Sequence, residues 1–253
     1  MIALKSHGEV AKMRRASVIV GEILGELSGM VKPGVSTRDL DQAAEIGIAR
    51  RGARPAFKNY RVGENVFPAV LCTSINEEIV HGIPSNRTLR EGDIIGLDFG
   101  VVYEGYFADS AVTVPVGRID ADAARLIDTT RRCLNAGIEQ MWPGRRIGDI
   151  GAAVQAVAES AGYGVVRDFV GHGIGRALHE DPQVPNFGVA GRGRALKEGM
   201  VLAVEPMINE GSPAVRMLND GWTAVTEDGK RSAHFEHTIA VTKDGPVVLT
   251  SVN

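Results

Sequence analysis

The chain carries one acidic pattern twice, once in each half. In the first half, Leu-Arg-Glu-Gly at 89–92 is followed by an apolar stretch and then by Asp98; in the second, Leu-Lys-Glu-Gly at 196–199 is followed by a stretch of equal length and then by Glu205. A carboxylate therefore ends a short apolar run, typical of a buried strand, in both halves. A chain of this kind is expected to fold as two related halves.

A second acid follows in each half, at the head of a β-like segment. Asp109 opens the segment 109–114 and Glu236 opens the segment 236–241. Four carboxylates brought to one place would repel each other strongly unless cations neutralised them. The pattern therefore predicts a metal site.

Helix signals precede the acids in both halves. Apolar or small residues spaced three and four apart between 10 and 31 predict an amphipathic helix that Pro33-Gly34 stops. A second helix is expected to begin at Ser36 or Thr37 and to end near Gly52. The same signals recur 110 residues later, at Pro143-Gly144, Asp149-Ile150 and Gly162.

The repeat predicts a single α+β domain over 1–253, made of two halves at about 1–117 and 118–253. The polar link at 117–122 is the natural seam between them. Equivalent residues of two halves packed face to face meet near their pseudo-twofold axis. The four acids are such residues, so we expect them to converge.

The first acid pair can be tested against hairpin geometry. If Glu104-Gly105 forms a two-residue turn, Asp98 faces Ala111 and Asp109 lies diagonally across on the same face as Asp98. Diagonal neighbours are about 7–8 Å apart at the backbone, so both side chains could reach a shared ion. A longer turn would shift this register. Solvated strand acids are the alternative interpretation, which the matching pair in the other half disfavours.

Composition excludes several classes of function. With 44% hydrophobic residues, 23% charged residues and a net charge of -3, the chain shows no bulk affinity for nucleic acid, so we expect no nucleic-acid substrate. Its two cysteines, Cys72 and Cys133, cannot build a disulfide framework or a zinc knuckle, which fits a reducing cytoplasm. We find no leader pattern and no apolar run of membrane-spanning length. The protein is expected to be soluble and cytoplasmic.

Histidines next to glycines are candidate ligands. His172 lies in Gly-His-Gly-Ile-Gly at 171–175, where the backbone can approach a neighbour closely, and His179 follows seven residues later. Beside four acids, a histidine completes a plausible two-metal set, although a structural role is the alternative for His179. His237 is expected to face away from Glu236 and to play a supporting role.

Other catalytic motifs are absent from the sequence. His179-Glu180 begins a zinc-protease helix motif, but Gln183 stands where its second histidine belongs. There is no Gly-x-Ser-x-Gly nucleophile elbow and no phosphate-binding Gly-x-x-x-x-Gly-Lys loop. Arg176 stands where the third glycine of a dinucleotide-binding motif belongs. Metal-assisted hydrolysis is the reaction class that remains.

Together these motifs resemble the type I methionine aminopeptidases of the pita-bread fold. The resemblance covers nearly the whole chain, and its motifs are highly specific. It implies two divalent ions, of cobalt, manganese, iron or zinc, with two of the ligands bridging them, Asp109 and Glu236. The motifs are Ser74-Ile75-Asn76-Glu77, His81-Gly82-Ile83-Pro84, Asp98, Asp109, Gly171-His172-Gly173-Ile174-Gly175, His179-Glu180, Glu205-Pro206-Met207, Asn219-Asp220-Gly221-Trp222 and Glu236-His237-Thr238. The metal ligands implied by the resemblance are Asp98, Asp109, His172, Glu205 and Glu236.

The resemblance also implies roles for residues around the metal site. His81 and His179 would line the scissile amide, His179 donating to the developing oxyanion and His81 contacting the leaving amide nitrogen. Glu205 would shuttle the proton of the attacking water. The methionine pocket would be formed by Phe67, Cys72, His81, Leu178 and Trp222, for some of which ordinary core packing is the alternative.

The chain departs from the usual family pattern at the pocket. Leu178 replaces a frequent aromatic residue, Val80 replaces a frequent cysteine, and the segment 54–66 is unusual. These departures concern the pocket's shape and leave the ligands unchanged.

The resemblance predicts removal of the initiator methionine from nascent polypeptides, with a preference for a small second residue, by a monomeric enzyme. A proline-directed peptidase of the same fold is the nearest alternative. A catalytically dead module that binds RNA or ribosomes is another, disfavoured because all five ligands are present. A local basic cluster predicts either a solvated surface, which we favour, or ribosome docking near the exit tunnel. It consists of Arg50, Arg51, Arg54, Lys58 and Arg61.

Overall fold

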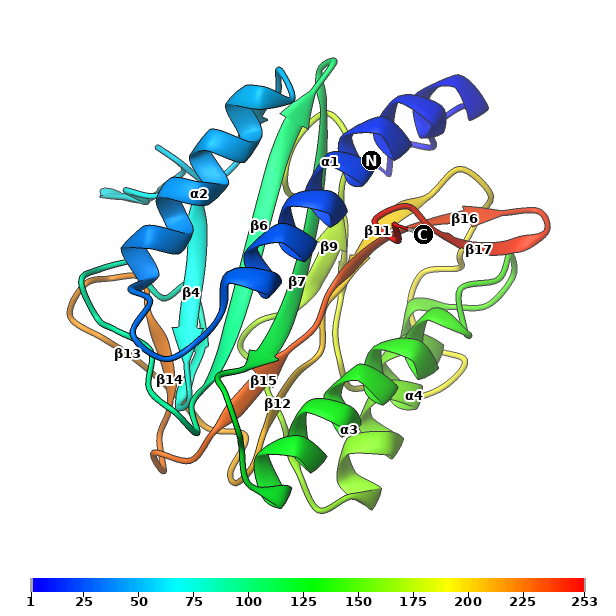
Figure 1. Ribbon diagram of the computed structural model, residues 1–253. Helices are drawn as coiled ribbons and strands as arrows, with labels where there is room; N and C mark the ends of the chain where they lie inside the picture. The colour runs from blue at the N-terminus through cyan, green and yellow to red at the C-terminus, as the bar shows by residue number, and fades with distance from the viewer. Residues whose placement is uncertain (1, 253) are drawn as a thin grey trace.

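The computed structural model describes residues 2–252 and shows two similar halves side by side (Figure 1). In each half two helices cover the outer face of antiparallel β-structure, and the strands of the two halves meet at the centre. This arrangement confirms the predicted α+β class and the two related halves. No helix within residues 2–252 is both long and apolar enough to cross a membrane.

The first half is dominated by the long β6–β7 hairpin, on which the first helix packs. Strand β6 also pairs with β1 and β4. Its elements are α1 (His7–Met30), α2 (Thr37–Arg50), β1 (Arg54–Pro55), β2 (Arg61–Val62), β3 (Asn65–Val66), β4 (Leu71–Ile75), β5 (Glu78–Val80), β6 (Ile94–Tyr103) and β7 (Tyr106–Pro115).

The second half has a five-stranded sheet in the order β10-β9-β11-β16-β17 and two smaller sheets, β15-β12-β8 and β13-β14-β5, the last of which borrows a strand from the first half. Its elements are α3 (Ala121–Ile138), α4 (Ile147–Ser160), β8 (Gly164–Val165), β9 (Gly171–Gly173), β10 (Glu180–Val184), β11 (Val201–Val204), β12 (Met207–Asn209), β13 (Val215–Met217), β14 (Ala224–Thr226), β15 (Ser232–His234), β16 (His237–Thr242) and β17 (Gly245–Val248).

Local signals explain the helix ends. α2 begins after Ser36, whose hydroxyl accepts from the Asp39 amide while the Asp39 carboxylate accepts from the Ser36 amide. α1 begins at His7, because Ser6 and Glu9 form the same capping box. Gly52 follows the end of α2 with φ 65°, as predicted for a helix stop.

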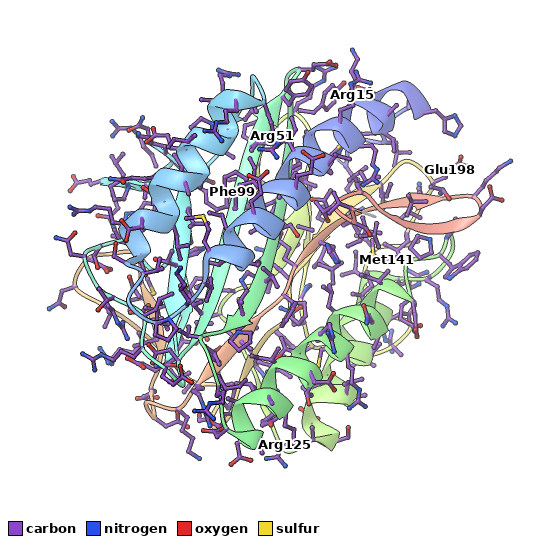
Figure 2. All side chains as sticks on the ribbon, viewed as in Figure 1. Arg15, Arg51, Phe99, Arg125, Met141 and Glu198 are labelled. Atoms are coloured by element: carbon purple, nitrogen blue, oxygen red, sulfur yellow. The ribbon has the colours of Figure 1, made fainter. Side chains whose placement is uncertain are left out.

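The two halves match in detail. Ser36 forms an isolated β-bridge with Thr88, and at the equivalent place in the second half Arg146 bridges Ala195. Each half also has its own apolar core between helices and strands, represented by Phe99 beneath α1 and α2 and by Met141 near α3 (Figure 2). The two cores hold the central strands in place from opposite sides.

Candidate metal centre and substrate pocket

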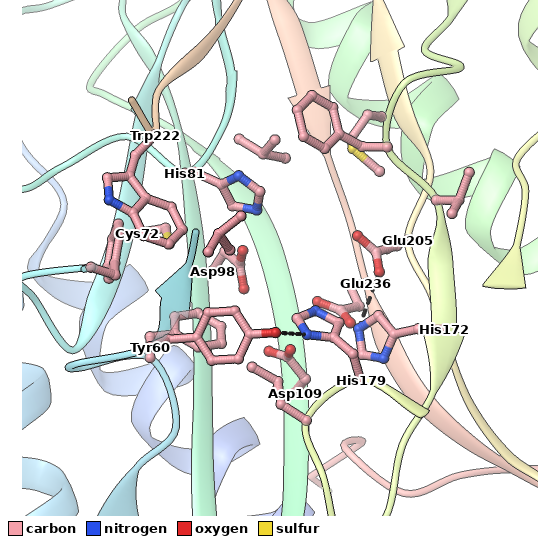
Figure 3. A pocket seen from close by; sticks show the side chains of 18 residues that line it. Tyr60, Cys72, His81, Asp98, Asp109, His172, His179, Glu205, Trp222 and Glu236 are labelled. Atoms are coloured by element: carbon pink, nitrogen blue, oxygen red, sulfur yellow. Dashed lines mark hydrogen bonds and ion pairs between the residues drawn. The ribbon is translucent and has the colours of Figure 1, made fainter. Parts of the chain in front are cut away.

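A cavity of about 200 Å³ opens between the central strands of the two halves (Figure 3). Every residue that the sequence predicted for the site lies on its wall: Asp98, Asp109, His172, Glu205, Glu236, His81, His179, Phe67, Cys72, Leu178 and Trp222. Seven further residues complete the wall: Phe57, Tyr60, Val62, Val80, Phe169, Val170 and Met207. The cavity is therefore acidic at one end and apolar at the other.

The first acid pair lies within the long hairpin. The turn at Glu104-Gly105 has φ of 50° and 80°, the left-handed values of a tight two-residue turn. Asp98 therefore pairs with Ala111, and Asp109 pairs with Gly100. The two aspartates are thus offset by two residues along the hairpin. The diagonal arrangement predicted from the sequence is confirmed.

The second acid pair lies at a break between strands. Glu205 follows the last residue of β11, and Glu236 precedes the first residue of β16. Because Val204 pairs with His237, the same register places Glu205 directly opposite Glu236. The two glutamates therefore lie just beyond the end of the β11–β16 pairing, whereas the two aspartates lie within the continuous β6–β7 pairing.

Hydrogen bonds across the central seam bring the two pairs together. The backbone amide of Glu236 donates to the carbonyl oxygen of Ala111 at 2.9 Å. Symmetrically, the hydroxyl of Thr238 donates to the carbonyl oxygen of Asp109 at 2.8 Å and accepts from the Asp109 amide at 3.2 Å. The pseudo-twofold axis therefore passes between these strands, next to Asp109 and Glu236.

His172 reaches the acids because its neighbours are glycines. A Cβ atom on Gly171 would lie 2.3 Å from the carbonyl oxygen of Ala203, and one on Gly173 would lie 2.3 Å from that of Asp181. Only glycines therefore allow β9 to lie between β10 and β11. The His172 Nδ1 lies 2.9 Å from the carbonyl oxygen of Gly173. Since a carbonyl only accepts, Nδ1 carries the proton, and Nε2 presents a lone pair 3.5 Å from Glu205 Oε1.

The acids are held in an unfavourable electrostatic environment. Burial raises the pKa of Asp109 to about 7. Burial, and then repulsion from Asp109, raises the pKa of both Asp98 and Glu205 well above the usual range. The pKa of Glu236 is raised in the same way, by burial and then by Asp109. A group of ionised carboxylates at neutral pH therefore requires positive charge.

The donor set fits a divalent cation. Ligand atoms of Asp109, His172 and Glu236 all lie within 4.8 Å of one another. One buried oxygen each of Asp98, Asp109 and Glu236 has no hydrogen-bond partner within residues 2–252. Unpartnered buried carboxylate oxygens, together with one imidazole nitrogen, are what a hard or borderline cation coordinates. Figure 3 shows the acid side chains pointing into this common space.

Two more histidines face the cavity from opposite halves. His81 follows β5 with φ 61°, and its ring packs edge-on against Phe169 and Trp222 at centroid distances of 5.4 and 6.4 Å. Burial, and then the charge of His179, lowers the pKa of His81 to about 4, so its imidazole is neutral at pH 7. The His179 ring lies 4.3 Å from that of His172, and its Nδ1 lies 2.7 Å from the hydroxyl oxygen of Tyr60.

The apolar end of the cavity is also part of the core. The rings of Phe67 and Trp222 meet edge to face at 5.2 Å, and those of Phe57 and Phe67 at 6.5 Å. Phe67, Cys72, Leu178 and Trp222 belong to one buried apolar cluster. Burial raises the pKa of the Cys72 thiol well above its usual range, which keeps it neutral. Both sequence interpretations, core and pocket wall, therefore hold for these residues.

Sequence reasoning did not assign six residues to the wall of the cavity: Phe57, Tyr60, Val62, Phe169, Val170 and Met207. Tyr60 and Val62 belong to the segment 54–66, whose unusual sequence was expected to affect the pocket's shape, although none of its residues was named as part of the wall. The turn formers Asn59 and Gly63, both with positive φ, were the available signal for a short hairpin there. Phe169 has no comparable local signal.

His237 and the basic cluster lie outside the cavity wall. His237 Nδ1 lies 2.8 Å from the hydroxyl of Thr250, so it faces away from Glu236 as predicted. In the cluster, Arg51 pairs with Glu22 and Glu26. Lys58 pairs in the same way with Glu45.

Comparisons with known proteins agree with this geometry. Residues 11–243 match metallopeptidase family M24. Methionine aminopeptidase 1 of Bacillus subtilis (strain 168) is 49% identical over 252 residues, covering 100% of both chains. The crystal structure of a methionine aminopeptidase from Thermotoga maritima superposes with a TM-score of 0.96 at 43% identity, again over 100% of both chains.

A prolidase from Pyrococcus horikoshii OT3 shares the fold with a TM-score of 0.79. It is 22% identical, and the match covers 99% of this chain but 64% of the prolidase. That likeness concerns the pita-bread fold alone, whereas the closer matches extend over the whole of both chains. The chain belongs to metallopeptidase family M24 and, within it, to the methionine aminopeptidases.

Proposed function

We propose that the protein removes the N-terminal methionine from newly made polypeptides by metal-assisted hydrolysis in the central cavity. The observation that carries this proposal is the joining of two features in one cavity. Unpartnered buried carboxylate oxygens and His172 stand at one end, and an apolar wall around Phe67 and Trp222 stands at the other. The first end suits cations and the second suits an unbranched thioether side chain.

We propose that two divalent cations are held by Asp98, Asp109, His172, Glu205 and Glu236, with Asp109 and Glu236 shared between them. The central position of these two acids at the seam supports the sharing. When bound, a cation pair activates water as a nucleophile at neutral pH and polarises the substrate carbonyl. Cobalt, manganese, iron and zinc all suit this donor set.

We propose roles for the remaining side chains from their positions. Glu205, beside His172 and next to the acids, is placed to take the proton of the attacking water and pass it to the leaving amine. His179 is placed to donate to the carbonyl oxygen as negative charge develops on it. His81, on the opposite wall, is placed to contact the leaving amide nitrogen.

The preference for a small second residue follows from the same two histidines. His81 and His179 line the same cavity from opposite halves. The scissile bond would lie between them, which restricts the space for the residue that follows it. A small side chain fits there with the least displacement of either ring.

Peptide hydrolysis with and without metal tests the function. We expect Met-Ala-Ser to lose its methionine on reconstituted protein and to remain intact on metal-stripped protein. Cleavage of an Ala-Pro peptide alone would support the proline-directed alternative, and cleavage without metal would refute the mechanism. A reconstituted protein that binds metal but cleaves neither peptide would support the binding-module alternative.

The proposed substrates are nascent chains in the cytoplasm, met by the protein as a monomer. Of the basic cluster, Arg51 and Lys58 are engaged in ion pairs, and Arg50, Arg54 and Arg61 are exposed. The ion pairs favour a solvated surface over ribosome docking. Ribosome co-sedimentation of an Arg50/Arg51/Arg54 alanine variant at the wild-type level would exclude docking through this cluster, and its loss would establish it.

A further inference from the structure

We propose that Tyr60 is a positioning residue, which holds His179 in the tautomer that carries its proton on Nε2 and so makes it a hydrogen-bond donor toward the substrate. The inference rests on the proposed function of His179. It concerns a residue in the unusual segment 54–66, and it assigns that segment a part in catalysis.

The contact itself is short. The Tyr60 hydroxyl oxygen lies 2.7 Å from His179 Nδ1, and the two rings meet edge to face at 5.4 Å (Figure 3). A distance of 2.7 Å is that of a good hydrogen bond. Burial raises the pKa of the Tyr60 phenol, so it keeps its proton at neutral pH.

The backbone of Tyr60 is fixed by the aromatic wall of the pocket. Its amide donates to the carbonyl oxygen of Phe57 at 2.8 Å, and its carbonyl oxygen accepts from the amide of Phe67 at 2.9 Å. Asn59, with φ 68°, makes the bend and donates to the carbonyl oxygen of Phe67. The hydroxyl that contacts His179 is thus held by the same residues that line the cavity.

The other end of the segment 54–66 is hydrogen-bonded to the loop that carries Trp222. The side-chain amide of Asn65 donates to the carbonyl oxygen of Gly221 at 3.3 Å, next to Trp222. A Cβ atom on Gly221 would lie 2.6 Å from Asn65 Nδ2, so a larger residue at 221 would push the Asn65 side chain away from this hydrogen bond. The short β2–β3 hairpin therefore spans from the Trp222 loop to His179.

The direction of the hydrogen bond decides what His179 can do. A neutral imidazole has one N–H, and the nitrogen that accepts a hydrogen bond leaves the other as the donor. The phenol is the more acidic partner, so it donates to Nδ1, and Nε2 then carries the proton. A donor at Nε2 can stabilise a developing oxyanion, whereas a lone pair there would repel it.

Tyr60→Phe tests the proposal, because phenylalanine keeps the ring and its packing but removes the hydroxyl. We expect kcat on Met-Ala-Ser to fall about tenfold, the loss of one well-placed hydrogen bond, with KM changed less than twofold. Tyr163→Phe is the matched control: its hydroxyl accepts from Arg125 Nε away from the cavity, and the variant should keep wild-type kinetics.

Nitrogen NMR of the His179 ring gives a readout independent of activity. In zinc-loaded protein at about pH 8, where an unperturbed imidazole is neutral, the wild type should show protonated Nε2 and unprotonated Nδ1. Tyr60→Phe should show a mixture of tautomers, with the signals assigned by their loss in His179→Asn. A wild type protonated at Nδ1, or a Tyr60→Phe variant with unchanged tautomer or unchanged kcat, would overturn the proposal. If the wild type shows the expected tautomer but cleaves no methionyl peptide, the proposed function fails and the tautomer assignment stands.

Discussion

The two halves of the molecule present the same scaffold to the cavity but different chemistry. In the first half the acids Asp98 and Asp109 lie inside one uninterrupted hairpin, β6–β7. In the second half Glu205 and Glu236 lie at a break, between β11 and β12 on one side and β15 and β16 on the other. At the break the backbone bonds to side chains: the Glu205 carbonyl oxygen accepts from the Asn186 side-chain amide at 3.0 Å, and that of Glu236 accepts from the Ser110 hydroxyl at 2.6 Å.

Strand register extends the comparison to the histidines. Ser74 pairs with Gly96, two residues before Asp98, and His172 pairs with Ala203, two residues before Glu205. His172 therefore occupies the position that Ser74 has in the first half. Ser74 and His172 are 98 residues apart in the sequence, and the same spacing separates His81 from His179.

The difference teaches how a symmetric frame supports a directional reaction. Acids at equivalent places supply oxygen ligands from both sides, and equivalent histidines line both faces of the cavity. The nitrogen donor comes from one side alone. A substrate amide therefore meets two chemically distinct faces, and substitutions at equivalent positions should have unequal effects.

Removing the imidazole of His172, the nitrogen ligand, should have the largest effect on metal content and activity. His172→Ala removes a proposed ligand, and we expect metal content and activity to fall together, the latter by about a thousandfold or more, since bound cations supply several kcal/mol of transition-state stabilisation. Ser74→Ala, at the equivalent position, should keep both within about tenfold. Metal analysis beside peptide kinetics measures this, and equal losses in the two variants would contradict the asymmetry.

The two equivalent histidines should differ in turnover but not in metal content. His179→Ala should lower kcat by about 10²–10³, the usual effect of removing an oxyanion donor, while most of the metal is retained. His81→Ala should lower kcat by a smaller factor. His81 is proposed only to contact the leaving amide nitrogen, and the proton that this nitrogen needs comes from Glu205. Unimpaired turnover in His179→Ala, measured at saturating metal, would refute its role.

Much of this site could be predicted from the sequence because its signals are local and repeated. The Glu104-Gly105 turn sets the register of β6–β7, and with it the diagonal placement of Asp98 and Asp109. The glycines around His172 predicted that neighbouring backbone would approach closely, and in the structure β10 and β11 do so on the two sides of β9. Each of these depends on residues adjacent in the chain.

What could not be predicted depends on contacts between distant segments. Tyr60 reaches His179 across 119 positions of sequence, through a hairpin whose orientation is fixed by Asn65 and Gly221. Phe169 meets His81 across the seam of the halves. Neither contact leaves a periodic or motif signal, since each depends on how separately folded pieces pack.

Stability against pH should show whether the acids need a cation. In metal-free protein the native acids have raised pKa values, so they hold protons that the unfolded chain has released, and the free energy of unfolding falls as pH rises. The loss due to Asp109 runs from about pH 4 up to its folded pKa of about 7, at roughly 1.4 kcal/mol per pH unit, and the other acids, whose pKa values burial raises well above the usual range, act in the same direction. Thermal unfolding measures this as a drop of several degrees, which added zinc or manganese should abolish.

Acid should also destabilise the protein, but through other residues. Burial lowers the pKa of His172 to about 4 and that of His234 to about 3, so below about pH 6.5 the unfolded chain gains protons that these residues resist. Between about pH 4 and 6.5 the histidines oppose the acids, so the loss of stability with rising pH should be clearest above about pH 6.5, where these histidines are mostly neutral in both the folded and the unfolded state. A stability that rises steadily from pH 6.5 to 8.5 without metal would contradict the placement of the acids.

The smallest predicted effect concerns His234, the buried neighbour of the second acid pair. Its Nε2 has no hydrogen-bond partner within residues 2–252 and lies 3.9 Å from Glu205 Oε2, whereas the equivalent position in the first half is Phe107. At 3.9 Å the pair makes no hydrogen bond in this structure, and we expect a small shift of Glu205 on cation binding to bring its carboxylate within reach of an N–H on Nε2, the kind of donor that orients ligand carboxylates. His234→Phe, which makes the halves alike here, should therefore weaken metal binding about tenfold, at the lower end for such supporting residues. His234→Gln keeps an N–H donor and should stay within about threefold of wild type. Competition with a chromogenic chelator measures both affinities, and thermal unfolding of the metal-free variants controls for packing. Equal affinities of the phenylalanine and glutamine variants would show that the break at Glu205, and not the donor beside it, distinguishes the two halves.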